Sequence, residues 1–125
     1  MGILNVTPDS FSDGGLYLDP SSAVERALLM QEEGADWIDV GGESSRPGAK
    51  AVSAAEEKKR ILPILKACSK VLRIPLSVDT YKAETAQAAV GEGAQMVNDI
   101  GALKLDPRMG KTLARLKVPV ILMHM

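Results

Sequence analysis

Short apolar runs alternate along this chain with longer segments whose apolar residues recur every three or four positions. The short runs predict strands, and the longer segments predict helices. The predicted strands cover residues 3–6, 36–40, 74–79, 96–99 and 118–125. The predicted helices cover residues 23–33, 53–68, 81–92 and 109–117. Alternating strands and helices predict a parallel α/β sheet, and the pattern marks no boundary within the single domain of residues 1–125.

Capping signals mark where the helices begin. Asp19 before Pro20 is an expected N-cap followed by proline at the first helical position, and Asp106 repeats this signal before the fourth helix. Ser53 opens a capping box at the second helix. Pro63 lies inside that helix, so we expect a kink or a split there.

The pattern is compatible with two closures of the sheet. One is an open, doubly wound sheet, and the other is part of a (β/α)8 barrel. A complete barrel needs about 250 residues, and this chain has 125. Hydrophobic periodicity does not distinguish the two closures.

Polar residues stand where the predicted strands end. They are Asn5, Asp39, Asp79, Asn98, Asp99 and His124. The carboxyl ends of parallel strands face the ligand site in α/β proteins, so the set indicates a polar site. Each residue also has a structural alternative, because Asp79 with Thr80 could cap the third helix and Asp99 could hold the turn at Gly101.

Two long loops follow the first two strands, at residues 7–15 and 41–48. Long loops in compact domains are often functional. The second loop combines glycines, hydroxyl groups and the guanidinium of Arg46, which suits a phosphate or diphosphate. It matches neither the P-loop nor the dinucleotide pattern, and Arg46 could equally pair with a surface carboxylate.

Composition narrows the class of protein. Hydrophobic residues make up 46%, charged residues 25%, and the net charge is -1, which is typical of a soluble globular protein without a nucleic-acid surface. No apolar run is long enough to span a membrane, and the start lacks the basic leader of a signal peptide. Aromatic residues are only 3%, so the core must be aliphatic.

Single copies of cysteine and histidine limit the chemistry. Cys68 cannot form an internal disulfide and is expected as a packed side chain, which fits a reducing cytoplasm. His124 has no second histidine or zinc-binding cysteine set beside it. The carboxylates and carboxamides could instead support Mg²⁺.

Two long motifs and three short ones resemble the signatures of dihydropteroate synthases. The long motifs are MGILNVTPDSFSDGG at residues 1–15 and IDVGGESSRPGA at residues 38–49. The short blocks SVDT, VNDI and LMHM follow in the family's order, at residues 77–80, 97–100 and 122–125. The resemblance covers essentially the whole chain.

The resemblance implies a fold and a reaction. The fold is a (β/α)8 barrel, of which this chain would be the first half. The reaction joins 6-hydroxymethyl-7,8-dihydropterin diphosphate to p-aminobenzoate and gives 7,8-dihydropteroate and diphosphate. Sulfonamides would occupy the p-aminobenzoate site, and a homodimer is expected because family members are typically dimers.

The resemblance also implies a role for particular residues. In order of ligand, they are Asn5 for Mg²⁺, Asp9, Phe11 and Pro47 for p-aminobenzoate, Ser45 and Arg46 for the diphosphate, and Asp79, Asn98, Ile100 and Met123 for the pterin. Ser45 departs from the usual threonine but keeps the hydroxyl. The family's further pterin-binding Asp and Lys, and its diphosphate-binding Arg and His, belong to the second half of the barrel.

Two other interpretations stay open at this point. The chain could be a half-barrel that binds pterin or assembles without catalysis, and its uncovered sheet edges would then need a partner. It could also be the pterin-binding domain of a corrinoid methyltransferase. The full loop at residues 7–15 favours the synthase, because that loop serves p-aminobenzoate.

Overall fold

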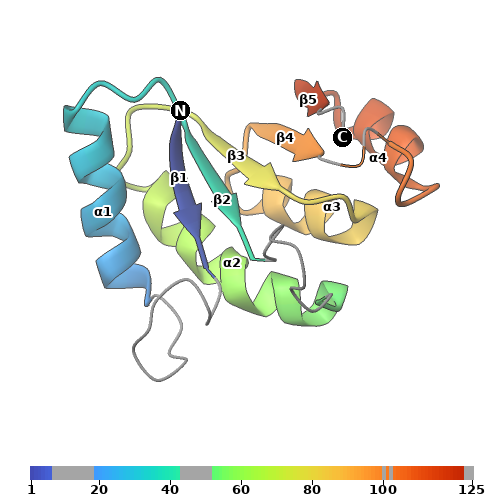
Figure 1. The fold of residues 1–125 in the computed structure, drawn as a ribbon, viewed down its shortest axis with the longest axis horizontal. Helices are drawn as coiled ribbons and strands as arrows, with labels where there is room; N and C mark the ends of the chain where they lie inside the picture. Colours follow the sequence, from blue (N-terminus) through green and yellow to red (C-terminus); the bar gives the residue numbers. More distant parts are fainter. Residues whose placement is uncertain (7–18, 43–51, 100, 102, 123–125) are drawn as a thin grey trace.

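A computed structural model describes residues 1–6, 19–42, 52–99, 101 and 103–122. Within these ranges strands and helices alternate as the sequence predicts (Figure 1). The strands are β1 (Gly2–Asn5), β2 (Ile38–Gly41), β3 (Leu76–Asp79), β4 (Met96–Asp99) and β5 (Val120–Leu122). The helices are α1 (Pro20–Glu32), α2 (Ala54–Ser69), α3 (Ala83–Gly91) and α4 (Met109–Leu116). None of the described helices is both long and apolar enough to cross a membrane.

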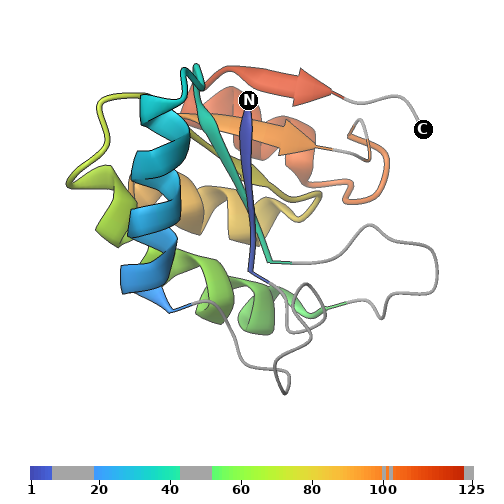
Figure 2. The ribbon, with the colours of Figure 1, turned by 60° about the vertical axis from the view of Figure 1, so that its left-hand side comes forward.

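The order of the strands decides between the two closures. All strands are parallel, and each pairs with the next one along the chain, in the order β1-β2-β3-β4-β5. A doubly wound sheet reverses its order at a switch point, and this sheet does not. Crossovers of one hand therefore place all four helices on one side of the sheet (Figures 1 and 2). This is the arrangement of the first half of a (β/α)8 barrel.

The core lies between the sheet and the helices. Leu4, Val40, Val78 and Val97 form one row across the first four strands, and each is 0% exposed. Alanines and branched residues of the helices complete this core, namely Ala23, Ala27, Ile61, Leu65, Ala86 and Ala89. The small residues let the helices pack closely on the sheet, as the aliphatic composition predicts.

The helix starts confirm two capping predictions. Asp19 accepts a hydrogen bond from the backbone N–H of Ser22 at 2.8 Å, and Pro20 is the first residue of α1. The Ser53 hydroxyl accepts from the backbone N–H of Glu56 at 3.1 Å at the start of α2. Both caps satisfy N–H groups that a helix start leaves without a partner.

Of two further expectations about the helices, Pro63 does not split its helix, which leaves the kink as a prediction, and the Asp106 cap of α4 is wrong. α2 continues through Pro63 without a split, and because the proline is exposed, water can reach the backbone carbonyl that loses its hydrogen bond. Asp106 is not the N-cap of α4, since that position is Arg108 and has no side-chain cap. Asp106 instead accepts from the backbone N–H of Ala83 at 2.8 Å, at the start of α3, where Lys82 offers no acceptor of its own.

Candidate functional site

The sheet register aligns residues from four strands in one row near the strand ends. Asn5 on β1 pairs with Gly41 on β2. Gly41 pairs in turn with Asp79 on β3, and Asp79 pairs with Asn98 on β4. Neighbouring strands lie about 4.8 Å apart, so these positions are next to one another in space. We call these four residues the strand-end row.

The strand-end row faces away from the helices. Val40 and Val78 directly precede Gly41 and Asp79, and both valines are buried in the core beneath the helices. Successive residues of a strand point to opposite faces. The row therefore belongs to the other face of the sheet, which becomes the inside when such a sheet closes into a barrel.

Asp39 lies on β2 two residues before Gly41, on the same face of the sheet as the strand-end row, and its side chain bonds Asn98 of that row. Its side chain is 4% exposed. The Ser77 hydroxyl donates to Oδ1 of Asp39 at 2.5 Å, and Nδ2 of Asn98 donates to Oδ2 at 3.2 Å. Burial raises the pKa of Asp39 above its ordinary value, and the hydrogen bonds from Ser77 and Asn98 offset part of that rise.

Asn98 keeps one polar atom without a partner. The residue is 4% exposed, and its Nδ2 is bound to Asp39. Its Oδ1 is buried and has no hydrogen-bond partner among the described residues. A buried acceptor left in this state costs about 1–3 kcal/mol. This oxygen is therefore an acceptor that a ligand donor could satisfy.

Gly41 keeps the space beside Asp79 open. A Cβ at position 41 would lie 3.2 Å from the Cβ of Asp79 and 3.3 Å from its Oδ2. Asp79 is half-buried and lies in the same row as Gly41, on the inner face of the sheet. A side chain larger than hydrogen at residue 41 would therefore compete with a ligand at this carboxylate.

A buried ionic group holds the end of β3 against α2. Glu57 is 1% exposed, and its Oε1 accepts from the Thr80 hydroxyl at 2.9 Å and lies 3.5 Å from Nζ of Lys82. Thr80 directly follows Asp79. Removing one partner of a buried charged pair is strongly destabilising, so this group fixes the backbone that carries Asp79.

The chain as a whole, residues 1–125, matches the family model described as "Pterin binding enzyme". The chain belongs to this family. A dihydropteroate synthase of Bacillus subtilis is 52% identical over 124 residues, which cover 99% of this chain and 44% of that protein. The chain therefore spans about half the length of the curated relatives it matches.

Solved structures of the family show the same likeness. Dihydropteroate synthase of Xanthomonas albilineans, solved with 4-aminobenzoic acid, superposes with a TM-score of 0.91 at 52% identity, over 99% of this chain and 45% of that one. The Yersinia pestis enzyme, solved with a sulfonamide drug complex, gives a TM-score of 0.90 at 46% identity, over 99% and 45% of the two chains. These family barrels support the closure that the strand order indicates.

Of the predicted contacts, the structure brings Asn5, Asp79 and Asn98 into one row. The others lie outside the described residues and stay predictions: Asp9, Phe11, Ser45, Arg46, Pro47, Ile100 and Met123. Asn5 is exposed at the end of β1. Among the described residues, no group of three or more His, Cys, Asp or Glu could hold a metal ion, so Mg²⁺ also stays a prediction.

Of the two structural alternatives, the turn held by Asp99 is confirmed, whereas the acceptor at the start of α3 is Asp106 rather than Asp79 or Thr80. Asp99 accepts from the backbone N–H groups of Gly101 at 2.8 Å and Leu103 at 2.9 Å, so it holds the turn. The Thr80 hydroxyl accepts from the backbone N–H of Lys82 at 3.1 Å near the start of α3. Asp99 also shares the core side of β4 with Val97, which separates it from Asn98.

Sequence reasoning placed Asp39 in the polar set at the strand ends but assigned it no ligand contact, and it gave no role to Ser77. One signal was available, because Asp39 lies two residues before Gly41 and Ser77 lies two residues before Asp79. A period of two places both on the same face as the strand-end row. Their mutual hydrogen bond depends on the register between β2 and β3 and has no local signature.

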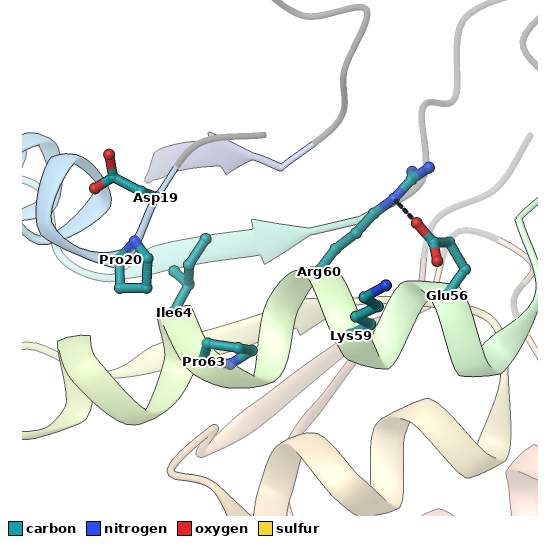
Figure 3. Close-up of a pocket in the computed structure, with 7 residues that line it drawn as sticks. All are labelled: Asp19, Pro20, Glu56, Lys59, Arg60, Pro63 and Ile64. Atoms are coloured by element: carbon teal, nitrogen blue, oxygen red, sulfur yellow. Dashed lines mark hydrogen bonds and ion pairs between the residues drawn. The ribbon is translucent and has the colours of Figure 1, made fainter. Parts of the chain in front are cut away.

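A hollow lies in the helix layer, between the start of α1 and the middle of α2 (Figure 3). Its lining residues are Asp19, Pro20, Glu56, Lys59, Arg60, Pro63 and Ile64. Arg60 is occupied there, with Nε 3.4 Å from Glu56 and Nη1 donating to the carbonyl of Gly42 at 2.7 Å. This hollow is on the opposite side of the sheet from the strand-end row and is not the candidate site.

Proposed function

We propose that this chain, as part of a complete (β/α)8 barrel, condenses 6-hydroxymethyl-7,8-dihydropterin diphosphate with p-aminobenzoate. The products are 7,8-dihydropteroate and diphosphate. The observation that carries the proposal is the strand-end row with the unpartnered Oδ1 of Asn98. The proposal is supported by the family membership and by relatives named dihydropteroate synthase.

The chemistry of the row suits a pterin. A pterin is a flat ring system with several N–H donors at its edge, and the Asp79 carboxylate and Asn98 Oδ1 are acceptors on one face of the sheet. Two fixed acceptors fix the orientation of a rigid ring, and such preorganisation lowers the entropic cost of reaching the reactive geometry. We assign pterin binding to Asp79 and Asn98, with Ile100 and Met123 completing the pocket.

The reaction needs separation of charge rather than a nucleophile on the enzyme. The amine nitrogen of p-aminobenzoate forms a bond to the methylene carbon of the pterin. The bond from that carbon to oxygen breaks, its electron pair leaves with the diphosphate, and the amine gives up a proton. Polar groups fixed in advance stabilise the developing charges, and in this proposal Ser45 and Arg46 bind the diphosphate.

Mg²⁺ at Asn5 is part of the proposal. The exposed carboxamide at the end of β1 offers one oxygen, which fits an ion that takes few protein oxygens and completes its coordination with water and phosphate. When bound, Mg²⁺ would neutralise negative charge on the leaving diphosphate. In the same proposal, Asp9, Phe11 and Pro47 border the p-aminobenzoate site, where sulfonamides compete.

The test uses residues 1–125 within a complete barrel, with the second half supplied by the natural protein or by the Bacillus subtilis relative. We call this protein the completed barrel. We expect diphosphate release that requires both substrates and Mg²⁺ and that sulfonamide inhibits in competition with p-aminobenzoate. Arg46→Ala should raise the KM for the pterin diphosphate about tenfold or more, because it removes a charge-assisted contact. Arg73→Ala, at an exposed arginine near the other end of the sheet, is the matched control.

The same experiment distinguishes the synthase from the two alternative functions. Pterin binding without turnover would replace the proposal with a non-catalytic pterin-binding protein. Methyl transfer to a corrinoid would replace it with the methyltransferase reading. A homodimer, which the family resemblance implies, is measured on the same sample by light scattering.

A further inference from the structure

The Asp39–Asn98 pair carries an inference beyond the contacts already proposed. An ionised carboxylate only accepts hydrogen bonds, whereas a carboxamide has one end that donates and one that accepts. Oδ2 of Asp39 faces Nδ2 of Asn98 at 3.2 Å, and the other carboxylate oxygen accepts from Ser77. The carboxamide of Asn98 can therefore satisfy Asp39 only with its NH₂ end.

This constraint decides which end of the carboxamide is left for a ligand. If the Asn98 side chain were turned by half a rotation, its carbonyl oxygen would face the oxygen of Asp39, and both would be buried acceptors. Both residues are 4% exposed, so water offers little relief for such a contact. The observed orientation leaves Oδ1 of Asn98 as the unpartnered atom.

We propose that Asp39 is a positioning residue that fixes the carboxamide of Asn98, so that the site accepts only a ring edge carrying an N–H donor at this point. This inference rests on the proposed function, because it takes the pterin as the ligand of Asn98. Asp39 contributes through Asn98 and does not contact the ligand itself. Ser77 holds Asp39 in place from the neighbouring strand.

The pair also explains why a charged residue lies in this part of the sheet. A neutral side chain that can both donate and accept would leave the Asn98 carboxamide free to take either orientation. A carboxylate removes that choice, and a site built to bond an N–H group rejects a ring with an acceptor in its place, because two acceptors would then meet unpaired. The hydrogen bonds from Ser77 and Asn98 offset part of the cost of burying the Asp39 carboxylate.

The test is a double-mutant cycle in the completed barrel, with 6-hydroxymethyl-7,8-dihydropterin as the probe and calorimetry as the measurement. Asp39→Ala and Asn98→Ala should each weaken binding by about tenfold, because each disturbs or removes the hydrogen bond between Asn98 and the ligand. The double variant should bind no more weakly than Asn98→Ala alone. Thermal melting of all four proteins checks that each one is folded.

A conservative variant gives a readout that a purely structural role would not move. In Asp39→Asn, the new carboxamide oxygen can accept from Asn98 while its NH₂ group donates to the Ser77 hydroxyl. The Asn98 carboxamide can then take either orientation, and a ligand N–H group selects the one that presents Oδ1, so binding should return to within about threefold of the unchanged protein. Should Asp39→Ala fail to fold, Asp39→Val takes its place, since it fills the space with a residue that favours strands.

Each result either supports or overturns the positioning role of Asp39. Additive losses in the double variant would overturn the inference, because Asp39 would then act on the ligand directly. The inference also fails if Asp39→Asn binds as weakly as Asp39→Ala, or if Asn98→Ala has no effect. If the unchanged protein does not bind the pterin at all, the proposed function itself fails, which separates that result from the others.

Discussion

The two faces of this sheet are built from alternate residues of the same strands, yet they have opposite characters. On the helix side, Leu4, Val40 and Val78 are fully buried in an aliphatic core. On the inner side, the next residues along the same strands are polar or small, and the apolar Ile3 is 52% exposed. One face is closed by local packing, and the other presents the strand-end row.

This difference indicates where stability and function reside. Burial of apolar area is the main stabilising contribution, and it is concentrated under the helices. The inner face instead holds an unpartnered acceptor and a buried carboxylate, which cost free energy in the absence of a ligand. Variants on the helix side should therefore change stability and leave binding unaffected, whereas variants on the inner side should do the reverse.

The largest expected effect tests the helix side. Leu65 on α2 is 0% exposed, so Leu65→Ala in the completed barrel should lower the free energy of unfolding by about 2–5 kcal/mol. Leu29→Ala on α1 is the matched control, because Leu29 is 56% exposed. Its cost should stay within about 1 kcal/mol. Chemical denaturation measures the free energy of unfolding of both variants. If Leu65→Ala lowers the pterin affinity under conditions where the protein is folded, the division between the two faces is contradicted.

The second effect tests the inner side. Asp79→Ala should weaken pterin binding in the completed barrel by about 30-fold or more, since hydrogen bonds to a charged group contribute roughly 1.5–3 kcal/mol. Calorimetry gives the affinity, and the melting temperature should change little. Glu84→Ala removes a carboxylate that is 53% exposed on α3 and pairs with Lys58 at 3.1 Å, so it should bind like the unchanged protein. Equal affinities for both variants would exclude Asp79 from the site.

A third and smaller effect concerns the space beside Asp79. Gly41→Ala would place a Cβ 3.3 Å from Oδ2 of Asp79, and the displaced carboxylate should cost several-fold in pterin affinity, or about 1 kcal/mol. Gly91→Ala in α3 is the control, because its added Cβ has no atom within 4 Å beyond its chain neighbours and the nearby backbone of its own helix. That control should keep its affinity and gain up to about 1 kcal/mol in stability. Unchanged binding in Gly41→Ala would show that the row tolerates a side chain at this position.

The division between faces also explains which parts of the fold and of the candidate site could be predicted from the sequence. Strands and helices follow from local periodicity, and the family motifs predict Asn5, Asp79 and Asn98 as ligand contacts, which the structure places in one row. The closure of the sheet did not follow, because it depends on which strands become neighbours. The strand order supplied that information.

Hydrogen bonds between residues far apart in the sequence could not be predicted for the same reason. Asp39 and Asn98 are 59 residues apart and come together across β3, which the register alone determines. Asp106 showed a local capping signal and was interpreted locally. In the structure Asp106 accepts locally from the backbone N–H of Arg108 and also from that of Ala83, 23 residues earlier in the chain.

The smallest effect concerns this cap on the helix side and depends on pH. Hydrogen bonds from the backbone N–H groups of Ala83 and Arg108 hold the pKa of Asp106 below its usual value of 3.8. Because the folded protein favours the ionised form, this contribution to stability is present above that pH and is lost as the pH falls through the lowered pKa.

Asp106→Ala should therefore cost about 1 kcal/mol at pH 7, as loss of a helix cap does. The difference between variant and unchanged protein should shrink in acid, which urea unfolding between pH 7 and about pH 3 measures. A difference that is constant over this range would mean that Asp106 acts through packing rather than through its charge, and a fall in pterin affinity at pH 7 would mean that the cap on α3 also controls the strand-end row.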